Sequence, residues 1–109
     1  MNAETLKGHL DMLLLAAVRG EPAHGYAIAE RLRSRSDGAF DLPEGTLYPA
    51  LHRLEDQDLI ASFWGTSENN RRAKYYRITP GGRRHLASER SRWSVLVDAV
   101  ARVLGPATG

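Results

Sequence analysis

The segment EGTLYPALHRLEDQDLI, residues 44–60, carries the pattern that decides the fold. Leu47, Leu51 and Leu54 recur at steps of four and three, the period of an amphipathic helix with one apolar face. The polar residues between them then lie on the opposite face, where they are free to contact another molecule. The side chains that the sequence places there are Thr46, Tyr48, Pro49, His52 and Arg53.

Pro49 decides where this helix is expected to begin. If the helix started at Glu44, Pro49 would lack the N–H of a helix hydrogen bond, and its ring would crowd the carbonyl four residues earlier. With Thr46 as the N-cap, Pro49 falls in the first turn, where backbone N–H groups need no partner within the helix. The sequence therefore predicts a helix that is capped by Thr46 and ends near Asp58.

Two shorter helices are predicted before this one. Apolar residues recur at three- and four-residue steps from Leu6 to Val18, and the turn GEPAHG, residues 20–25, ends that helix. The next stretch, YAIAERLRSR, residues 26–35, has an apolar side and a charged side. It predicts a second helix, whose apolar side includes Tyr26.

A β-hairpin is predicted after the three helices. The runs LIASFWG, residues 59–65, and AKYYRIT, residues 73–79, favour strands, and the polar stretch GTSENNRR, residues 65–72, favours a turn between them. Trp64 is expected to pack inside the protein. The basic side of the hairpin has few apolar neighbours, so solvent is expected to surround Asn69, Asn70, Arg71, Arg72 and Lys74.

A long helix is predicted at the end of the chain. Thr79 and Pro80 form an N-cap and first position, and an apolar residue returns every seven residues from Gly82 to Leu104. A helix of roughly 23 residues is about 35 Å long, too long for its apolar side to lie on one small core. A second subunit is therefore expected on Leu86, Trp93, Leu96, Val97, Val100 and Leu104.

Composition limits the other possibilities. The 109 residues are 42% hydrophobic and 26% charged, which suits one small folded domain. With no cysteine, the chain has no disulfide and no thiol nucleophile. The apolar run at 12–18 is too short for a signal peptide or a membrane span, so a cytoplasmic location is expected.

Charge is segregated along the chain although its net value is only +2. Residues 1–70 hold six basic and eleven acidic side chains, whereas residues 71–92 hold eight basic side chains and one acidic. Such a basic block suits a polyanion such as DNA, because binding releases counterions. A basic face that is simply solvated is the other interpretation of the same block.

The order of elements predicts a mainly α (α+β) fold, a winged helix-turn-helix domain at 1–79 followed by a dimerisation helix at 80–109. In such domains the third helix enters the major groove of DNA and the hairpin, or wing, contacts the DNA backbone. The expected partners are double-stranded DNA and a second copy of the chain. No cofactor and no metal are expected.

Three strings also resemble the PadR family of bacterial transcriptional regulators: HGYAIAERL at 24–32, EGTLYPALHRLEDQDLI at 44–60 and RRAKYYRITPGGRRHL at 71–86. The length and the single C-terminal helix are similar to its short subfamily. The resemblance implies a homodimer that usually represses transcription and releases DNA when it binds an effector.

The same resemblance implies roles for single residues. Tyr48 and Pro49 match the motif of the reading helix, and Arg72 and Lys74 match the basic wing. Tyr26 matches the motif that opens the second helix, where it is equally a packing residue or a DNA contact. For Tyr48, a half-buried ring that props the turn before the helix is the alternative to a DNA contact. Trp93 falls near a tryptophan that stacks on flat aromatic drugs in some relatives, which implies an effector pocket at Trp93 and Val97. Filling the dimer interface is the alternative for Trp93.

Two other classes of function remain open at this point. A protein-interaction module with the same shape would use its basic wing on an acidic protein surface. A small metal-dependent hydrolase would need His, Asp and Glu ligands that converge. His52 with Glu55 and Asp56 has helical spacing for a metal site, but the four histidines fall on different elements, and no metal site is predicted.

Overall fold

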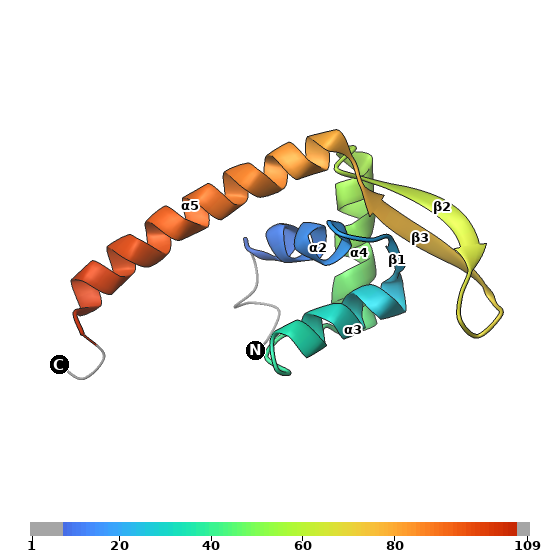
Figure 1. Ribbon diagram of the computed structural model, residues 1–109, viewed down its shortest axis with the longest axis horizontal. Helices are drawn as coiled ribbons and strands as arrows, with labels where there is room; N and C mark the ends of the chain where they lie inside the picture. Colours follow the sequence, from blue (N-terminus) through green and yellow to red (C-terminus); the bar gives the residue numbers. More distant parts are fainter. Residues whose placement is uncertain (1–7, 107–109) are drawn as a thin grey trace.

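The computed structural model describes residues 8–106, which form four helices and a small antiparallel sheet that lies at one end of the molecule (Figure 1). The predicted start of the first helix at Leu6 lies outside the described residues. The elements follow the predicted order with one addition, the short strand β1. They are α2 (Leu10–Val18), β1 (Ala23–His24), α3 (Gly25–Arg35), α4 (Glu44–Asp56), β2 (Ile60–Thr66), β3 (Arg72–Ile78) and α5 (Pro80–Leu104).

Helix α2 lies in the middle of the core. It contacts α3, α4 and α5, and its buried side chains include Leu14 and Leu15. The leucine stripe of α4, Leu47, Leu51 and Leu54, is fully buried as its spacing predicted. This packing turns the opposite face of α4 towards solvent.

The sheet has the strand order β1-β3-β2, with β3 in the centre. The predicted hairpin of β2 and β3 is confirmed, and the sheet register pairs Ile60 with Ile78 at its base and Thr66 with Arg72 near its turn. Strand β1 pairs Ala23 with the buried Tyr76. Because β1 has only two residues, no period could have revealed it, and the sequence indicated only a turn there.

The predicted start of α4 is wrong. The helix begins at Glu44 with Pro43 as its N-cap, so Pro49 lies inside the helix instead of in its first turn. The carbonyl of Pro43 accepts hydrogen bonds from the N–H groups of Thr46 and Leu47, each at 3.0 Å, so Thr46 is a helical residue and not the cap. Gly45 is exposed, so its carbonyl, which the ring of Pro49 deprives of a partner, faces water.

Arg31 joins α3 to the end of α2. Its guanidinium donates hydrogen bonds to the carbonyl of Ala17 at 2.8 Å and to that of Glu21 at 2.7 Å. It also reaches the carbonyl of Pro22 at 3.3 Å. Carbonyls at and beyond a helix C-terminus lack hydrogen-bond donors within the helix, and the Arg31 guanidinium supplies those donors. The angle between α2 and α3 is fixed as a result.

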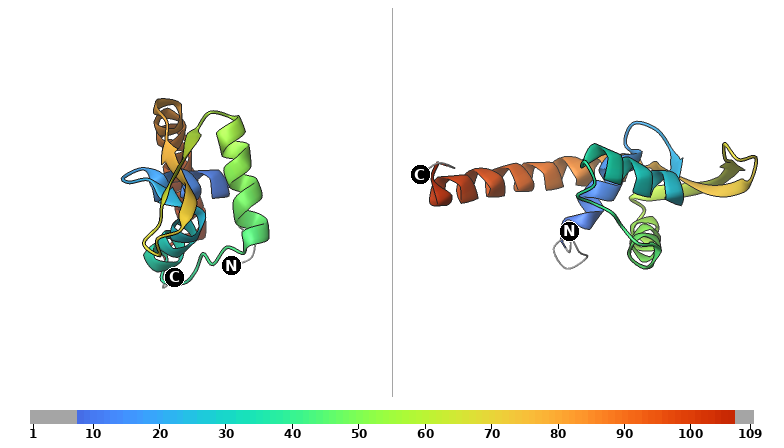
Figure 2. Two further views of the ribbon diagram at one scale, coloured as in Figure 1. Left: turned by 90° about the vertical axis from the view of Figure 1, so that its right-hand side faces the viewer. Right: turned by 90° about the horizontal axis from the view of Figure 1, so that it is seen from below.

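Helix α5 begins as predicted and leaves the body of the protein. Thr79 accepts a hydrogen bond from the N–H of Gly82 at 2.9 Å and donates one to the carbonyl of Asp58 at 2.7 Å. Leu86, only 3% exposed, belongs to the core of its own chain. Beyond it the helix extends as a rod away from the end where the hairpin projects (Figure 2). Gly105, with φ at +75°, ends the helix.

Substitution of Gly82 tests the junction between α5 and the sheet. A Cβ at Gly82 would lie 2.0 Å from the Leu59 carbonyl oxygen and 2.8 Å from Cγ1 of Ile78, so backbone would have to move. We expect Gly82→Ala to lower the free energy of unfolding by about 3 kcal/mol. Gly81→Ala is the matched control, because its Cβ would approach nothing closer than 3.7 Å. Thermal unfolding of both variants checks this, and equal melting temperatures would contradict it.

Candidate nucleic-acid interface

A groove of about 1140 Å³ runs between the hairpin, the length of α3 and the middle of α4. Three elements that are far apart in sequence meet along it. Its walls carry both aromatic and basic side chains, among them Tyr26, Tyr48, His52, Trp64 and Arg72. The predicted reading helix and the predicted wing therefore share one concave surface.

Tyr48 lies at the junction of α4 and α3. Its ring occupies the space that Gly25 leaves open, since a Cβ at Gly25 would lie 2.5 Å from the tyrosine Oη. The side chain nonetheless remains exposed and lines the groove. The two roles weighed for Tyr48 are thus compatible, because one edge supports α3 and the other faces the groove.

The other residues predicted at the tip of the reading helix do not all lie there. Pro49 and His52 are exposed and Thr46 is half-buried, all in the N-terminal two-thirds of α4. Arg53 was predicted at that tip, which is wrong, because it lies in the last turn of α4. Its guanidinium pairs with the carboxylate of Asp11 on α2. Arg53 therefore ties α4 to α2.

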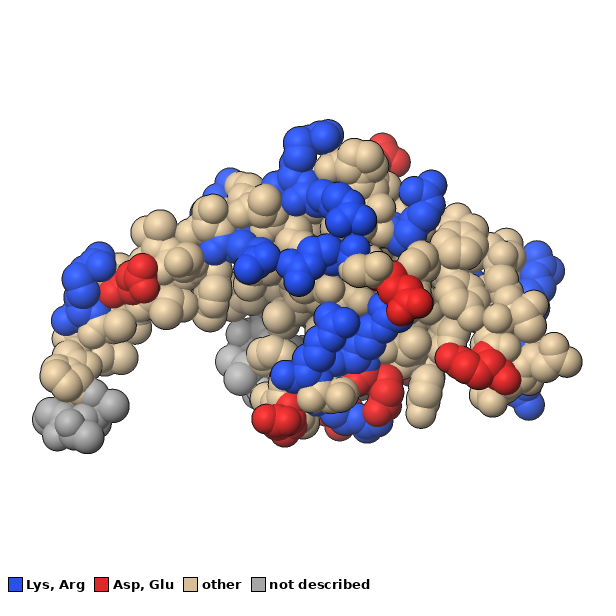
Figure 3. Space-filling model, viewed as in Figure 1, with Lys and Arg blue, Asp and Glu red and all other residues tan. Residues whose placement is uncertain are grey.

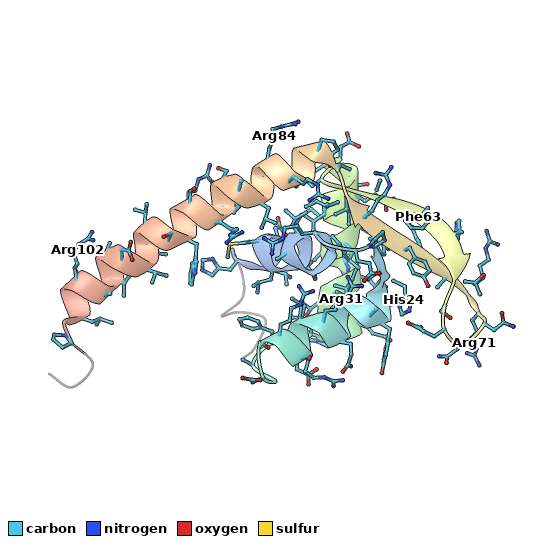
Figure 4. The ribbon with its side chains drawn as sticks, in the orientation of Figure 1. His24, Arg31, Phe63, Arg71, Arg84 and Arg102 are labelled. Carbon is cyan, nitrogen blue, oxygen red and sulfur yellow. The ribbon has the colours of Figure 1, made fainter. Side chains whose placement is uncertain are left out.

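The tip of the hairpin is polar and open to solvent. Asn69, Asn70 and Arg71 are exposed, as predicted, and Asn70 has φ at +60°, which closes the turn. Arg71 stands at the end of the hairpin in Figure 4. Its guanidinium and that of Arg72 form no ion pair within the part of the chain that the structure describes. Both cations are thus available to phosphates.

Trp64 was expected to pack inside the protein, and this is wrong. The side chain is 60% exposed and lies on the groove side of β2. The guanidinium of Arg72 lies 4.4 Å from the centre of its ring, a cation–π contact that holds the arginine against the strand. The hairpin therefore presents a preformed aromatic and cationic pair.

Lys74 differs from the two arginines because its charge is already paired. Its Nζ lies 3.4 Å from Oε1 of Glu55 on α4, and the other carboxylate oxygen accepts a hydrogen bond from Ser62 on β2. The hydrogen bond from Ser62, followed by the contact with Lys74, lowers the pKa of Glu55 below its ordinary value. Lys74 was predicted to lie free in solvent, and that prediction is wrong.

His24 caps α3 and meets the turn of the hairpin. Its Nδ1 accepts a hydrogen bond from the N–H of Ala27 at 3.2 Å, and its Nε2 lies 3.5 Å from the carboxylate of Glu68. The backbone N–H of Glu68 itself, and then His24, lower the pKa of the Glu68 carboxyl. The first turn of α3 is therefore close to the tip of the hairpin.

Sequence reasoning missed one aromatic residue of the groove, Trp64, which it assigned to packing. For Tyr26 it left a packing role in the apolar stripe and a DNA contact equally open, and the side chain is 72% exposed at the start of α3 and lines the groove. Hydropathy does not distinguish an exposed aromatic ring from a buried one. Trp64 pairs with Lys74 near the polar turn of the hairpin. This position close to the turn was the feature of the sequence that could have indicated its exposure.

The basic block of the sequence divides between two places. Arg71, Arg72 and Lys74 belong to the hairpin, whereas Arg83, Arg84 and Arg90 lie on α5 and are absent from the groove wall. Arg84 and Arg71 stand at distant points in Figure 4. In the view of Figure 3, lysine and arginine gather over α3 and the first half of α5. The groove therefore receives only part of the predicted positive charge.

The far half of α5 carries a row of apolar side chains, each of which is at least 42% exposed in the structure of residues 8–106. These are Trp93, Val95, Leu96, Val97, Val100, Val103 and Leu104. Leu86 was predicted to meet a second subunit, but its burial in the core leaves it no surface for a partner.

Trp93 is the one member of this row with an aromatic neighbour among the described residues. The ring of His9 meets it edge to face, with centroids 4.9 Å apart. The hollow beside Trp93 is about 100 Å³, and Val97 is not in its wall. Drug-sized ligands occupy about 300 Å³ or more, so one chain alone does not form an effector pocket there.

Neither a metal cluster nor a membrane-spanning helix is found in the described part of the chain. No three His, Asp or Glu side chains come close enough together among residues 8–106 to hold a metal ion, and His52, Glu55 and Asp56 form no such group. No helix there is both long and apolar enough to cross a membrane.

Comparison with known proteins gives a consistent result. The sequence model of the Transcriptional regulator PadR-like family matches residues 14–88. Transcriptional regulator Rv3488 of Mycobacterium tuberculosis is 35% identical over 82 residues, which cover 75% of this chain and 70% of that protein.

Solved structures of transcriptional regulators superpose on almost the whole chain. A transcriptional regulator from Clostridium thermocellum superposes with a TM-score of 0.84 at 28% identity, covering 94% of this chain and 100% of that one. A PadR family transcriptional regulator from Eggerthella lenta has a TM-score of 0.77 at 40% identity, covering 93% and 86% of the two chains.

Proposed function

Because the chain belongs to the PadR-like family of transcriptional regulators, which bind DNA and are not enzymes, we propose that it acts as a homodimeric repressor. One observation carries the proposal: the groove brings Tyr48 and His52 of α4 and the free cations of the hairpin onto one surface. In this proposal α4 enters the major groove of an operator, and the hairpin contacts the flanking backbone.

The proposed DNA contacts are chosen among the side chains that form no ion pair within residues 8–106. Arg71 and Arg72 bind phosphates, because their charges have no acidic partner in the described chain. Tyr48 and His52 face the bases and the sugar edge, and the positive end of the α4 dipole adds attraction for phosphate. Arg53 and Lys74 are left out, because Asp11 and Glu55 neutralise them. The proposed DNA-contact residues are Thr46, Tyr48, Pro49, His52, Asn70, Arg71 and Arg72.

Salt-dependent binding to duplex DNA tests the contacts. We expect the chain to bind a duplex from its own upstream region more tightly than an unrelated duplex, with a steep fall in affinity as salt rises. Arg71→Ala and Arg72→Ala should each lower the salt slope by about one, while Tyr48→Phe should reduce the preference for the cognate duplex.

Arg102→Ala is the matched control for charge, since Arg102 lies at the far end of α5 (Figure 4) and should leave the slope unchanged. Fluorescence anisotropy measures the wild type and the four variants. Absence of salt-dependent binding by the wild-type chain would contradict the proposal and favour the protein-interaction module instead.

We propose that a second copy covers the apolar row on α5. Val97 and Val100 are about half exposed although both are apolar, and a heptad repeat of this kind is typical of paired helices. Burial of such a row against an identical row removes it from water, which is the main favourable term in association. The proposed interface is Trp93, Leu96, Val97, Val100 and Leu104, without Leu86.

A charge in this row should separate the subunits. We expect Val100→Asp to raise the dimer dissociation constant by at least about 100-fold, because the carboxylate would lose water without gaining a partner. Ser91→Asp is the control, since nine residues are two and a half helical turns and place Ser91 on the opposite side of α5. Sedimentation equilibrium distinguishes the two, and a dimeric V100D protein would contradict the interface.

We propose further that a small hydrophobic or aromatic effector binds between the two α5 helices at Trp93 and Val97 and releases DNA. The hollow in one chain is too small for such a ligand, so a second copy has to complete the pocket. The effector would act by changing the angle between the paired helices and so the spacing of the two reading helices.

Tryptophan fluorescence tests the effector site. The chain has two tryptophans, so in Trp64→Phe all emission comes from Trp93. We expect a planar aromatic dye to quench that emission and to weaken DNA binding, and Trp93→Ala to abolish the effect of the dye on DNA binding. A dye that releases DNA equally well from W93A would contradict this site.

A further inference from the structure

Glu55 connects the last turn of α4 to both strands of the hairpin. One carboxylate oxygen accepts a hydrogen bond from Ser62 on β2, and the other lies 3.4 Å from Nζ of Lys74 on β3. The side chains of Lys74 and Glu55 are only 35% and 30% exposed. The pair is thus better shielded than a surface ion pair, and salt screens it less.

The position of this contact along the hairpin indicates that it holds the hairpin against α4. On the side of β3 that faces α4, Ile78 and Tyr76 are buried, Lys74 is half-buried and Arg72 is exposed. On β2, Ile60 is buried, Ser62 is half-buried and Trp64 is exposed. The contact of Glu55 with Ser62 and Lys74 therefore lies where the hairpin passes from its buried base to its exposed part.

A repressor of the proposed kind needs the hairpin at a fixed angle to α4, because both must reach one duplex at the same time. The strand ends at the base are set by the core. Between that base and the free cations at Arg71 and Arg72, Glu55 is the ion-paired contact of the hairpin with α4, while His24 joins the hairpin turn to α3.

From this arrangement we propose that Glu55 is a positioning residue, which sets the angle between wing and reading helix through Ser62 and Lys74. Lys74 then supports DNA binding by pairing with Glu55, and it does not itself contact a phosphate. The inference rests on the proposed DNA-binding function and assigns two of its residues to a role other than contact.

The sign of one substitution separates this role from simple electrostatics. Glu55→Gln removes a negative charge near DNA and frees Lys74, so electrostatics alone would tighten binding. A positioning role predicts the opposite. We expect E55Q to weaken affinity for the cognate duplex by about fivefold without changing the salt slope.

Lys74→Met completes a double-mutant cycle. We expect it also to weaken binding by about fivefold with an unchanged salt slope, whereas loss of a phosphate contact would lower the slope by about one. The double variant E55Q/K74M should bind no more weakly than either single variant, because each already breaks the same tie.

Asp56→Asn is the matched control. Asp56 is the next acidic residue on α4, is exposed and forms no ion pair within residues 8–106. D56N therefore changes charge without breaking the tie, and it should bind DNA as tightly as the wild type or slightly more tightly. Affinities are measured well below the melting temperature of each variant. If E55Q does not fold, Ser62→Ala breaks one arm of the contact instead.

Hydrogen exchange of the hairpin amides decides the same question without DNA. We expect the amides of residues 62–74 to exchange faster in E55Q and K74M than in the wild type and in D56N. Tighter DNA binding by E55Q, a lower salt slope in K74M, or unchanged exchange in both variants would overturn the positioning role. Failure of the wild-type chain to bind duplex DNA would instead overturn the proposed function, with hydrogen exchange still testing the tie.

Discussion

Burial of the leucine stripe of α4 against α2 is the constraint on which the rest of the structure depends. Because Leu47, Leu51 and Leu54 have to leave water together, only one rotation of the helix about its axis is possible. That rotation turns Tyr48 and His52 outward and brings the charged side chains of the last two turns to neighbouring elements. The same hydrophobic contact thus determines which side chains of α4 face the groove and which ones pair with neighbouring elements.

Ion pairing divides the polar residues around the groove into two sets. Where a carboxylate lies within reach, as Asp11 does for Arg53 and Glu55 for Lys74, the cation serves to join elements. Where none lies within reach among the described residues, as at Arg71, the cation keeps its charge for an outside partner. A count of basic residues therefore overstates the positive charge that a polyanion meets, since paired charges release few counterions.

Helix α5 shows how a small core limits what one chain can bury. Its first turns pack on the body through Gly82 and Leu86, but the body ends before the helix does, and the remaining apolar side chains have no local cover. The overall extents of 54 × 28 × 22 Å reflect this elongated shape. A single domain of this length has no further surface on which to fold the helix back.

The sequence by itself determined every element that depends on a local pattern: the leucine helix, the two helices before it, the hairpin and the long C-terminal helix with its Thr79 cap. Tertiary structure alone decided the two-residue strand β1, the exposure of Tyr26 and Trp64, and the start of α4. It also decided which cations are free. Arg53 and Asp11 are 42 residues apart, and Lys74 and Glu55 are 19 apart. Hydrophobic period reports neighbours within a few residues, whereas such pairs exist only after packing has brought distant elements together.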